Sequence, residues 1–92
     1  MIHIYKNSPD CITKLKRVLG ITGLNDTLIF IGDGVLNLFN ANAPDWPEGV
    51  RICCLENDLQ ARGLSDPSCG EVITMELFVE IVASDLNSPV SW

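Results

Sequence analysis

Four cysteines are the most reactive side chains that this 92-residue sequence offers. A cysteine reacts as its thiolate, so its exposure and its neighbours decide whether it can act as a nucleophile or carry a sulfur atom. Cys11 falls in the first turn of a predicted helix, where the helix dipole favours a thiolate and the adjacent Asp10 opposes it. Cys69 lies in a predicted exposed loop, with no basic residue nearby in the sequence. Both are candidate reactive thiols, and an inert role is the favoured interpretation for each.

The two remaining cysteines and the single histidine are weaker candidates for catalysis. Cys53 and Cys54 are consecutive in a predicted inner strand, so their side chains should point to opposite faces and pack as small hydrophobic groups. His3 is the single histidine, and it lies in the first predicted strand. Nothing in the sequence supplies the third member of a catalytic triad, so a packed or hydrogen-bonded histidine is the favoured interpretation.

Segments of strand and helix character alternate along the chain. Strands are predicted at residues 2–5, 27–31, 50–55 and, more weakly, 72–74, and helices from Ser8 to Gly20, from near Val35, from Asp58 to Gly63 and over 75–86. The second and third strands are nearly continuous apolar runs, as in strands covered on both faces. The first strand alternates apolar and polar residues, which favours an edge strand or one wet face. The pattern predicts a three-layer α/β/α domain with a mainly parallel sheet of about four strands.

Polar segments follow three of these strands, at the sheet edge where open α/β folds bind ligands. They are Lys6-Asn7, Gly32-Asp33-Gly34 and Glu56-Asn57-Asp58. The glycine motifs that hold nucleotide phosphates are absent from the sequence, and carboxylates at two strand ends would repel a phosphate. We therefore expect no nucleotide cofactor. A divalent cation at these carboxylates is the alternative, but helix capping is favoured, so we expect no metal.

Size, hydropathy and charge narrow the class of protein. A chain of 92 residues has room for one hydrophobic core, which predicts a single domain over residues 1–92. Without a signal peptide or a long apolar run, we expect a cytoplasmic protein with reduced cysteines and no membrane contact. The net charge of −6 argues against direct binding of nucleic acid. Four of the six basic residues fall in the first 24 residues, and a solvated helix face is favoured over a binding patch there.

Short segments spread over nearly the whole chain resemble, in order, the TusB/DsrH family of sulfur-relay subunits. No one of them is specific, and the resemblance comes from the ordered set in a chain of this length. The segments are His3, Asn7-Ser8-Pro9, Asp33-Gly34-Val35, Leu55, Asp58-Leu59, Ala61-Arg62-Gly63, Phe78-Val79 and Ser91-Trp92.

The resemblance, closer to TusB than to DsrH, implies a small Rossmann-like domain that assembles with TusC/DsrF-like and TusD/DsrE-like subunits. In that family a cysteine of the TusD/DsrE-like subunit chiefly carries a persulfide, which passes toward tRNA wobble 2-thiouridine synthesis or dissimilatory sulfur oxidation. Some DsrH members carry a further cysteine in the first helix, and the matching position here is Val18. Because valine cannot hold a persulfide, the resemblance implies a non-catalytic subunit without a cofactor.

Candidate partner-interface residues come from the same segments and from the two tryptophans. They are His3, Asp33, Gly34, Arg62, Trp46 and Trp92. Aromatic residues are enriched at interface cores, but a terminal tryptophan can equally fold back onto its own domain.

Two alternatives to the accessory subunit stay open. One is a sulfurtransferase that carries a persulfide on its own Cys11 or Cys69. The other is a small homo-oligomeric binding domain unrelated to sulfur, since a fold alone does not define a function. We also expect that the isolated chain can self-associate when its partners are absent.

Overall fold

The sheet in this computed structural model has five strands in the order β4-β3-β2-β1-β5, and each pair of neighbours is parallel. The structure describes residues 1–40, 45–67 and 69–92. The strands are β1 (Ile2–Tyr5), β2 (Thr27–Phe30), β3 (Arg51–Leu55), β4 (Glu71–Ile73) and β5 (Val90–Ser91). The helices are α1 (Ile12–Ile21), α2 (Glu56–Ala61) and α3 (Met75–Ser84), with 3₁₀ helices η1 (Pro9–Cys11) and η2 (Gly32–Phe39).

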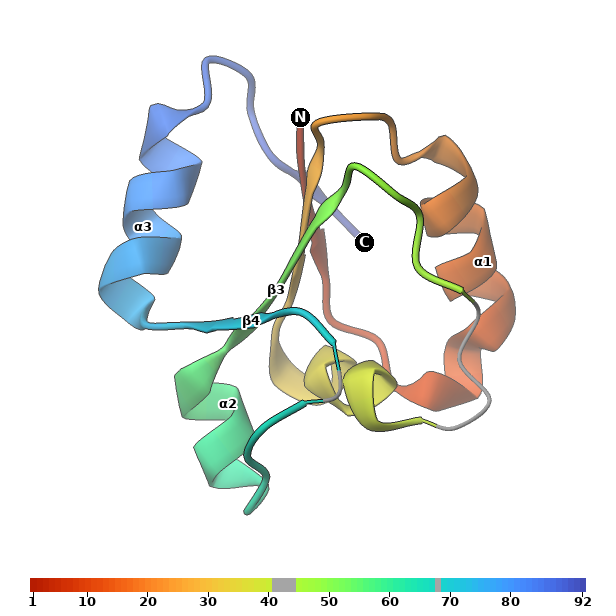
Figure 1. Cartoon of the computed structure of the whole chain (residues 1–92), viewed down its shortest axis with the longest axis vertical. Helices are drawn as coiled ribbons and strands as arrows, with labels where there is room; N and C mark the ends of the chain where they lie inside the picture. Colours follow the sequence, from red (N-terminus) through yellow and green to blue (C-terminus); the bar gives the residue numbers. More distant parts are fainter. Residues whose placement is uncertain (41–44, 68) are drawn as a thin grey trace.

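Helices on both sides of the sheet make three layers (Figure 1). α1 lies on one side and α3 on the other, and α2 extends from the end of β3 beyond the sheet. One buried cluster includes Leu15 of α1 and Phe30 of β2, and the other includes Ile29 of β2 and Ile81 of α3. Neighbouring residues of β2 thus serve two cores, as expected for a strand covered on both faces. The predicted α/β/α class is confirmed.

The predicted number of strands was one too low. β5 has only two residues, and it pairs with β1 through His3 with Val90 and Ile4 with Ser91. A strand of two residues shows no periodicity, and Pro89 just before it is typical of a loop. The pairing places β1 inside the sheet, so the predicted edge position of β1 was wrong.

The alternation in β1 does not mark a wet face. His3 is only 2% exposed, and Ile2 and Tyr5 are buried as well. His3 is the polar residue of the alternating pattern, and it is buried because side chains from other parts of the chain satisfy both of its ring nitrogens. A polar residue in a strand therefore does not by itself indicate contact with solvent.

The helix starts differ from those predicted. α1 begins at Ile12, after the 3₁₀ turn η1, and it continues past Gly20 to Ile21. Ser8 occupies the N-cap position of η1, but its side chain makes no capping hydrogen bond. The helix expected near Val35 is the 3₁₀ helix η2, which begins at Gly32.

Two further predictions at helix ends need correction. Asp58 does not cap α2 but lies inside its first turn. The last helix, α3, ends at Ser84, so Leu86 lies beyond it and is fully exposed. Ile81 is the buried residue of α3, whereas Val79 is 57% exposed. The loop predicted between Asn40 and Gly49 has no helix or strand over residues 45–49, and residues 41–44 lie outside the described part of the chain.

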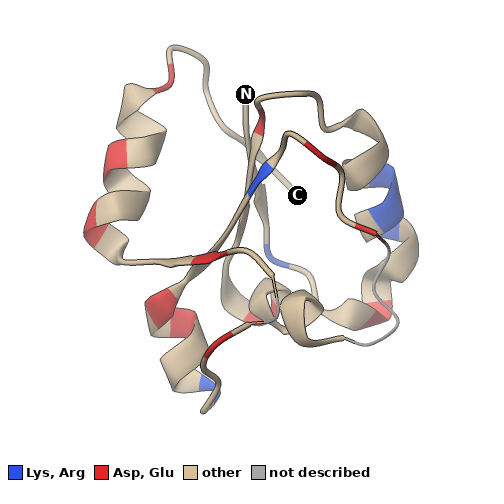
Figure 2. Ribbon diagram, in the orientation of Figure 1, with Lys and Arg blue, Asp and Glu red and all other residues tan. Residues whose placement is uncertain are grey.

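The helices α1 and α3, on opposite sides of the sheet, differ in charge (Figure 2). Basic residues colour α1 and acidic residues colour α3. α1 holds Lys14, Lys16 and Arg17 and no acidic residue. α3 holds Glu76 and Glu80 and no basic residue. The fold therefore places two helices of opposite charge on opposite sides of the sheet.

Candidate functional site

The carboxyl ends of β1 and β2 approach each other closely at the sheet edge where open α/β folds bind ligands. Gly34 follows β2 at this edge, and a Cβ atom there would overlap with the carbonyl oxygen of Tyr5. Only glycine lets η2 pass so near to β1. The buried Asn37 holds the two segments together, because its Nδ2 donates to the carbonyl oxygens of Asn7 and Gly34, each at 2.9 Å. The close approach of η2 to β1 therefore explains why glycine is needed at position 34.

Two buried polar atoms at this edge have no partner among the described residues. They are Nδ2 of Asn7, a donor, and Oδ1 of Asn37, an acceptor. Most buried polar atoms in proteins are hydrogen-bonded, so such a pair at the ligand-binding edge is unusual. Nothing in the sequence pattern set Asn37 apart, because it lies in a helix of otherwise ordinary composition.

Arg62 joins two of the predicted site segments at the surface. Its guanidinium donates to Oδ1 of Asp33 at 2.7 and 3.2 Å, and to the carbonyl oxygen of Asp58 at 3.0 Å. Asp58 in turn accepts a hydrogen bond from the backbone N–H of Gly32 at 2.9 Å. These bonds connect α2 to the start of η2. The structure thus brings together Asp33, Gly34 and Arg62, three of the six candidate interface residues.

His3 does not belong to this group, because it lies near the amino end of β1. Its Nε2 is 3.0 Å from Oδ2 of Asp26. Its Nδ1 accepts a hydrogen bond at 3.3 Å from the indole N–H of Trp92, and the centroids of the two rings are 6.2 Å apart. Both ring nitrogens are therefore engaged, and neither is available as a base toward a substrate. The structure supports the structural role for His3.

Asp26 is a site residue that the sequence did not reveal. Besides His3, it accepts hydrogen bonds from the backbone N–H of Gly23 at 2.9 Å and from the Met1 ammonium at 3.0 Å. These bonds, that of Gly23 first, lower the pKa of Asp26 to about 2. Its neighbours in sequence, Asn25 and Thr27, gave no signal, because its partners come from other segments of the chain.

Both tryptophans pack on their own chain. Trp92 contacts His3, and its backbone N–H donates to the carbonyl oxygen of Ile4 at 2.9 Å. Trp46 makes an edge contact with Phe30, with ring centroids 5.6 Å apart. Each remains partly exposed. Trp92 thus folds back onto its own domain, and contact of either ring with a partner subunit stays a prediction.

The thiols differ sharply in exposure. Cys53 and Cys54 are fully buried in separate core clusters, which confirms that they face opposite sides of β3. Burial raises the pKa of each to about 11. Cys11 is exposed at the end of η1, whereas Cys69 is partly buried, not exposed as expected. Val18 of α1 is fully buried on the side of the helix that faces the sheet.

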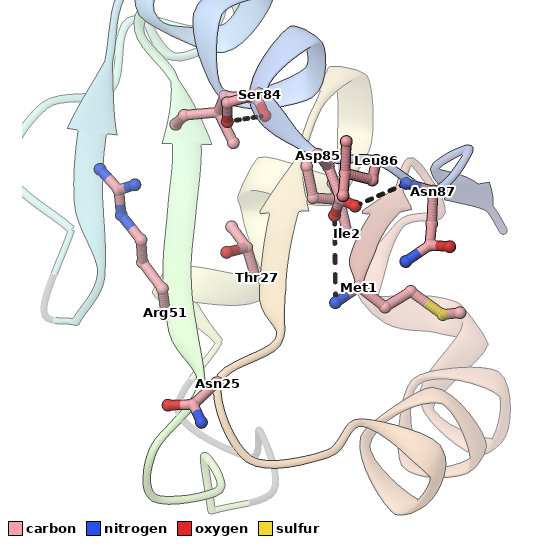
Figure 3. A pocket seen from close by; sticks show the side chains of 10 residues that line it. Met1, Ile2, Asn25, Thr27, Arg51, Ser84, Asp85, Leu86 and Asn87 are labelled. Carbon is pink, nitrogen blue, oxygen red and sulfur yellow. Dashed lines mark hydrogen bonds and ion pairs between the residues drawn. The ribbon is translucent and has the colours of Figure 1, made fainter.

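A polar hollow of about 410 Å³ lies away from the cysteines and from the Asp33–Arg62 pair (Figure 3). It opens between the end of α3 and the amino ends of β1, β2 and β3. Its charged lining groups are already paired: the Met1 ammonium lies 4.0 Å from Asp85, and Arg51 contacts Glu71 at 2.7 Å. That contact raises the pKa of Arg51 and lowers that of Glu71. The hollow therefore offers little free charge to a ligand.

The described residues contain no group of three His, Cys, Asp or Glu side chains that could hold a metal ion. Within the same part of the chain, no helix has the length and apolar character needed to cross a membrane.

Comparison with known proteins identifies the class. The family described as DsrH like protein matches residues 7–87, and the chain belongs to this family. Membership indicates a subunit of a multi-subunit sulfur-relay complex. Among solved structures, the YchN protein of E. coli superposes with a TM-score of 0.71 over 99% of this chain and 97% of that one, at 13% identity, and so shares the fold. No curated protein sequence matches the chain significantly.

Proposed function

We propose that this chain is a non-catalytic, TusB-like subunit of a cytoplasmic sulfur-relay complex. Its partners are TusC/DsrF-like and TusD/DsrE-like subunits, and the complex passes persulfide sulfur toward tRNA wobble 2-thiouridine synthesis. Family membership supports the sulfur-relay role. The absence of a reactive thiol at the expected position supports the accessory role within it.

The burial of Val18 is the observation that carries the accessory role. Position 18, where some relatives carry a cysteine, faces the core with no exposed surface. A sulfur atom there would have no path to an acceptor, whatever the residue. Cys53 and Cys54 are equally buried, and their raised pKa keeps them as unreactive thiols at neutral pH.

The Asp33–Arg62 pair forms the proposed docking surface for a partner subunit, and the buried Gly34 beside it lets η2 hold Asp33 in place. Asp33 is 62% exposed and Arg62 is 26% exposed, so both present charged groups to the outside. Arg62 is held by three hydrogen bonds, which leaves it less conformational freedom to lose when a partner binds. Arginine held in this way is a common anchor at protein interfaces.

Co-expression with TusC-like and TusD-like subunits from the same genome tests this function. We expect one complex in size-exclusion chromatography, and we expect Arg62→Ala to weaken it. Arg51→Ala is the matched control, because it also removes an arginine that is paired with a carboxylate, at a different end of β3. Separate elution of the three subunits at micromolar concentration would refute the proposal. Equal losses in both variants would refute the docking surface.

Intact-mass analysis separates the accessory role from the sulfurtransferase alternative. The isolated chain is incubated with a cysteine desulfurase and its sulfur carrier. We expect no mass gain, because the accessory role assigns sulfur to none of this chain's cysteines, including the exposed Cys11. A gain of about one sulfur atom that Cys11→Ser or Cys69→Ser abolishes would establish direct transfer instead.

The pathway is tested by deletion of the gene. Loss of 2-thiouridine from wobble positions of tRNA is the expected result. Unchanged tRNA together with impaired sulfur oxidation would assign the complex to dissimilatory sulfur metabolism.

A further inference from the structure

The outer side of α3 carries an apolar stripe that is open to solvent. Met75 is 43% exposed and Val79, one turn later, is 57% exposed. Glu76 and Glu80 are exposed alongside it at the same helical spacing. This surface, Met75, Glu76, Val79 and Glu80, is called the acidic face below.

The outer side of α1 has the matching properties with the opposite charge. Arg17 is exposed and Lys14 is partly exposed, and their helical spacing places both on the same side as Ile21. Ile21, at the end of the helix, is 56% exposed, and Leu24, just beyond it, is 75% exposed. This surface, residues 14, 17, 21 and 24, is called the basic face below. Each face thus combines exposed apolar side chains with charges of one sign.

We propose that the basic face of one chain docks on the acidic face of a second copy when partner subunits are absent. Each face alone leaves apolar area in water, and contact between them buries that area while it brings opposite charges together. Contact between two acidic faces or two basic faces would instead bring like charges together. Charge complementarity therefore selects the pairing of unlike faces.

The geometry of the sheet makes this contact head-to-tail. α1 and α3 lie on opposite sides of one sheet, so each copy presents one face of each kind (Figures 1 and 2). A contact between different surfaces does not close on itself in a dimer, and it leaves a free face at each end for further copies. The association grows with concentration, and it is independent of the sulfur-relay role.

Sedimentation velocity of the purified chain at low salt tests the proposal. We expect the weight-average mass to rise with concentration above that of a monomer. We expect Glu76→Lys/Glu80→Lys and Lys14→Glu/Arg17→Glu each to weaken association by about tenfold or more, because each puts like charges on both faces. All four side chains lie at the surface, and circular dichroism confirms that the variants are folded.

Mixing the two variants is the decisive step. In an equimolar mixture, each variant's changed face is complementary to the changed face of the other, and the unchanged faces are complementary too. We expect the mixture to regain the association of the original chain. No recovery in the mixture, or a chain that stays monomeric at all concentrations, would overturn the proposal.

Asn57→Lys/Gln60→Lys/Asp66→Lys is the control for net charge. It makes the same change in total charge as Glu76→Lys/Glu80→Lys, at exposed residues outside α1 and α3. We expect this variant to associate as the original chain does. Equal loss of association would show that net charge controls self-association and would also overturn the proposal.

Discussion

Trp92 donates its indole N–H to Nδ1 of His3 at 3.3 Å and so ties the end of the described chain to the first strand. An indole nitrogen only donates, so Nδ1 must accept, and the ring proton lies on Nε2, which donates to Asp26 at 3.0 Å. Three side chains from distant segments therefore form one chain of hydrogen bonds. Its integrity requires histidine in this neutral form.

Substitution of Trp92 tests this connection. We expect Trp92→Phe to lower the free energy of unfolding by about 1–2 kcal/mol, because an aromatic ring remains but the buried Nδ1 of His3 loses its donor. Urea unfolding followed by circular dichroism measures the loss. Trp46→Phe is the control, because a phenyl ring can keep the edge contact with Phe30. Equal losses would mean that ring packing, not the hydrogen bond, matters at Trp92.

Asp26 should make stability depend on acidity. Its pKa of about 2 in the folded chain lies below its ordinary value of 3.8, so the charged form stabilises the fold. This contribution, about 1–2 kcal/mol, is present above about pH 4 and is lost as the pH falls toward 2. We expect Asp26→Asn to be less stable at pH 7, with a difference that shrinks toward pH 2 in urea unfolding. A difference that stays constant with pH would contradict the assignment.

Substitution by alanine should change the free energy of unfolding in opposite directions at Gly34 and at Gly20. We expect Gly34→Ala to lower the free energy of unfolding by about 1–3 kcal/mol, because its Cβ would overlap with the carbonyl oxygen of Tyr5. Gly20 lies within α1 and a Cβ there meets nothing within 4 Å, so Gly20→Ala should stabilise the chain by about 0.5–1 kcal/mol. Thermal unfolding of both variants measures the difference. A Gly34→Ala variant as stable as the original would show that η2 can move away from β1.

Alkylation of the native chain should distinguish the thiols. With iodoacetamide at pH 8, we expect Cys11 to react readily, because it is exposed. Cys53 and Cys54 should react only after unfolding, because burial removes access and raises their pKa to about 11. Peptide mass spectrometry identifies the modified residues. Labelling of the central pair in folded protein would reveal local opening of β3.

The parts of the fold that the sequence predicted correctly depend on local signals. The apolar runs of β2 and β3 identify buried strands, and consecutive Cys53 and Cys54 had to face opposite sides of one of them. Gly63, with a φ of +65°, follows α2 as expected of a glycine after a helix. The order of these elements was enough to predict the layers.

The parts that were missed depend on contacts between distant residues. β5 exists because Val90 and Ser91 pair with β1, not because of their own pattern. The burial of His3 depends on Asp26 and Trp92, which no local signal connects to it. The partial burial of Cys69 was missed for the same reason, because Cys69 packs against a core formed by distant residues. At the candidate site, the nearness of Gly32-Asp33-Gly34 to Asp58 followed from the order of strands.

The pairing of β5 with β1 has a consequence for synthesis on the ribosome. β1 is made first, but one of its two neighbours arrives only when residues 90 and 91 have left the exit tunnel. Until then β1 has an open edge of unpaired backbone groups, which can pair with a nascent neighbour on the same message. We infer that β1 is most prone to pair with another chain before residues 90 and 91 have been made.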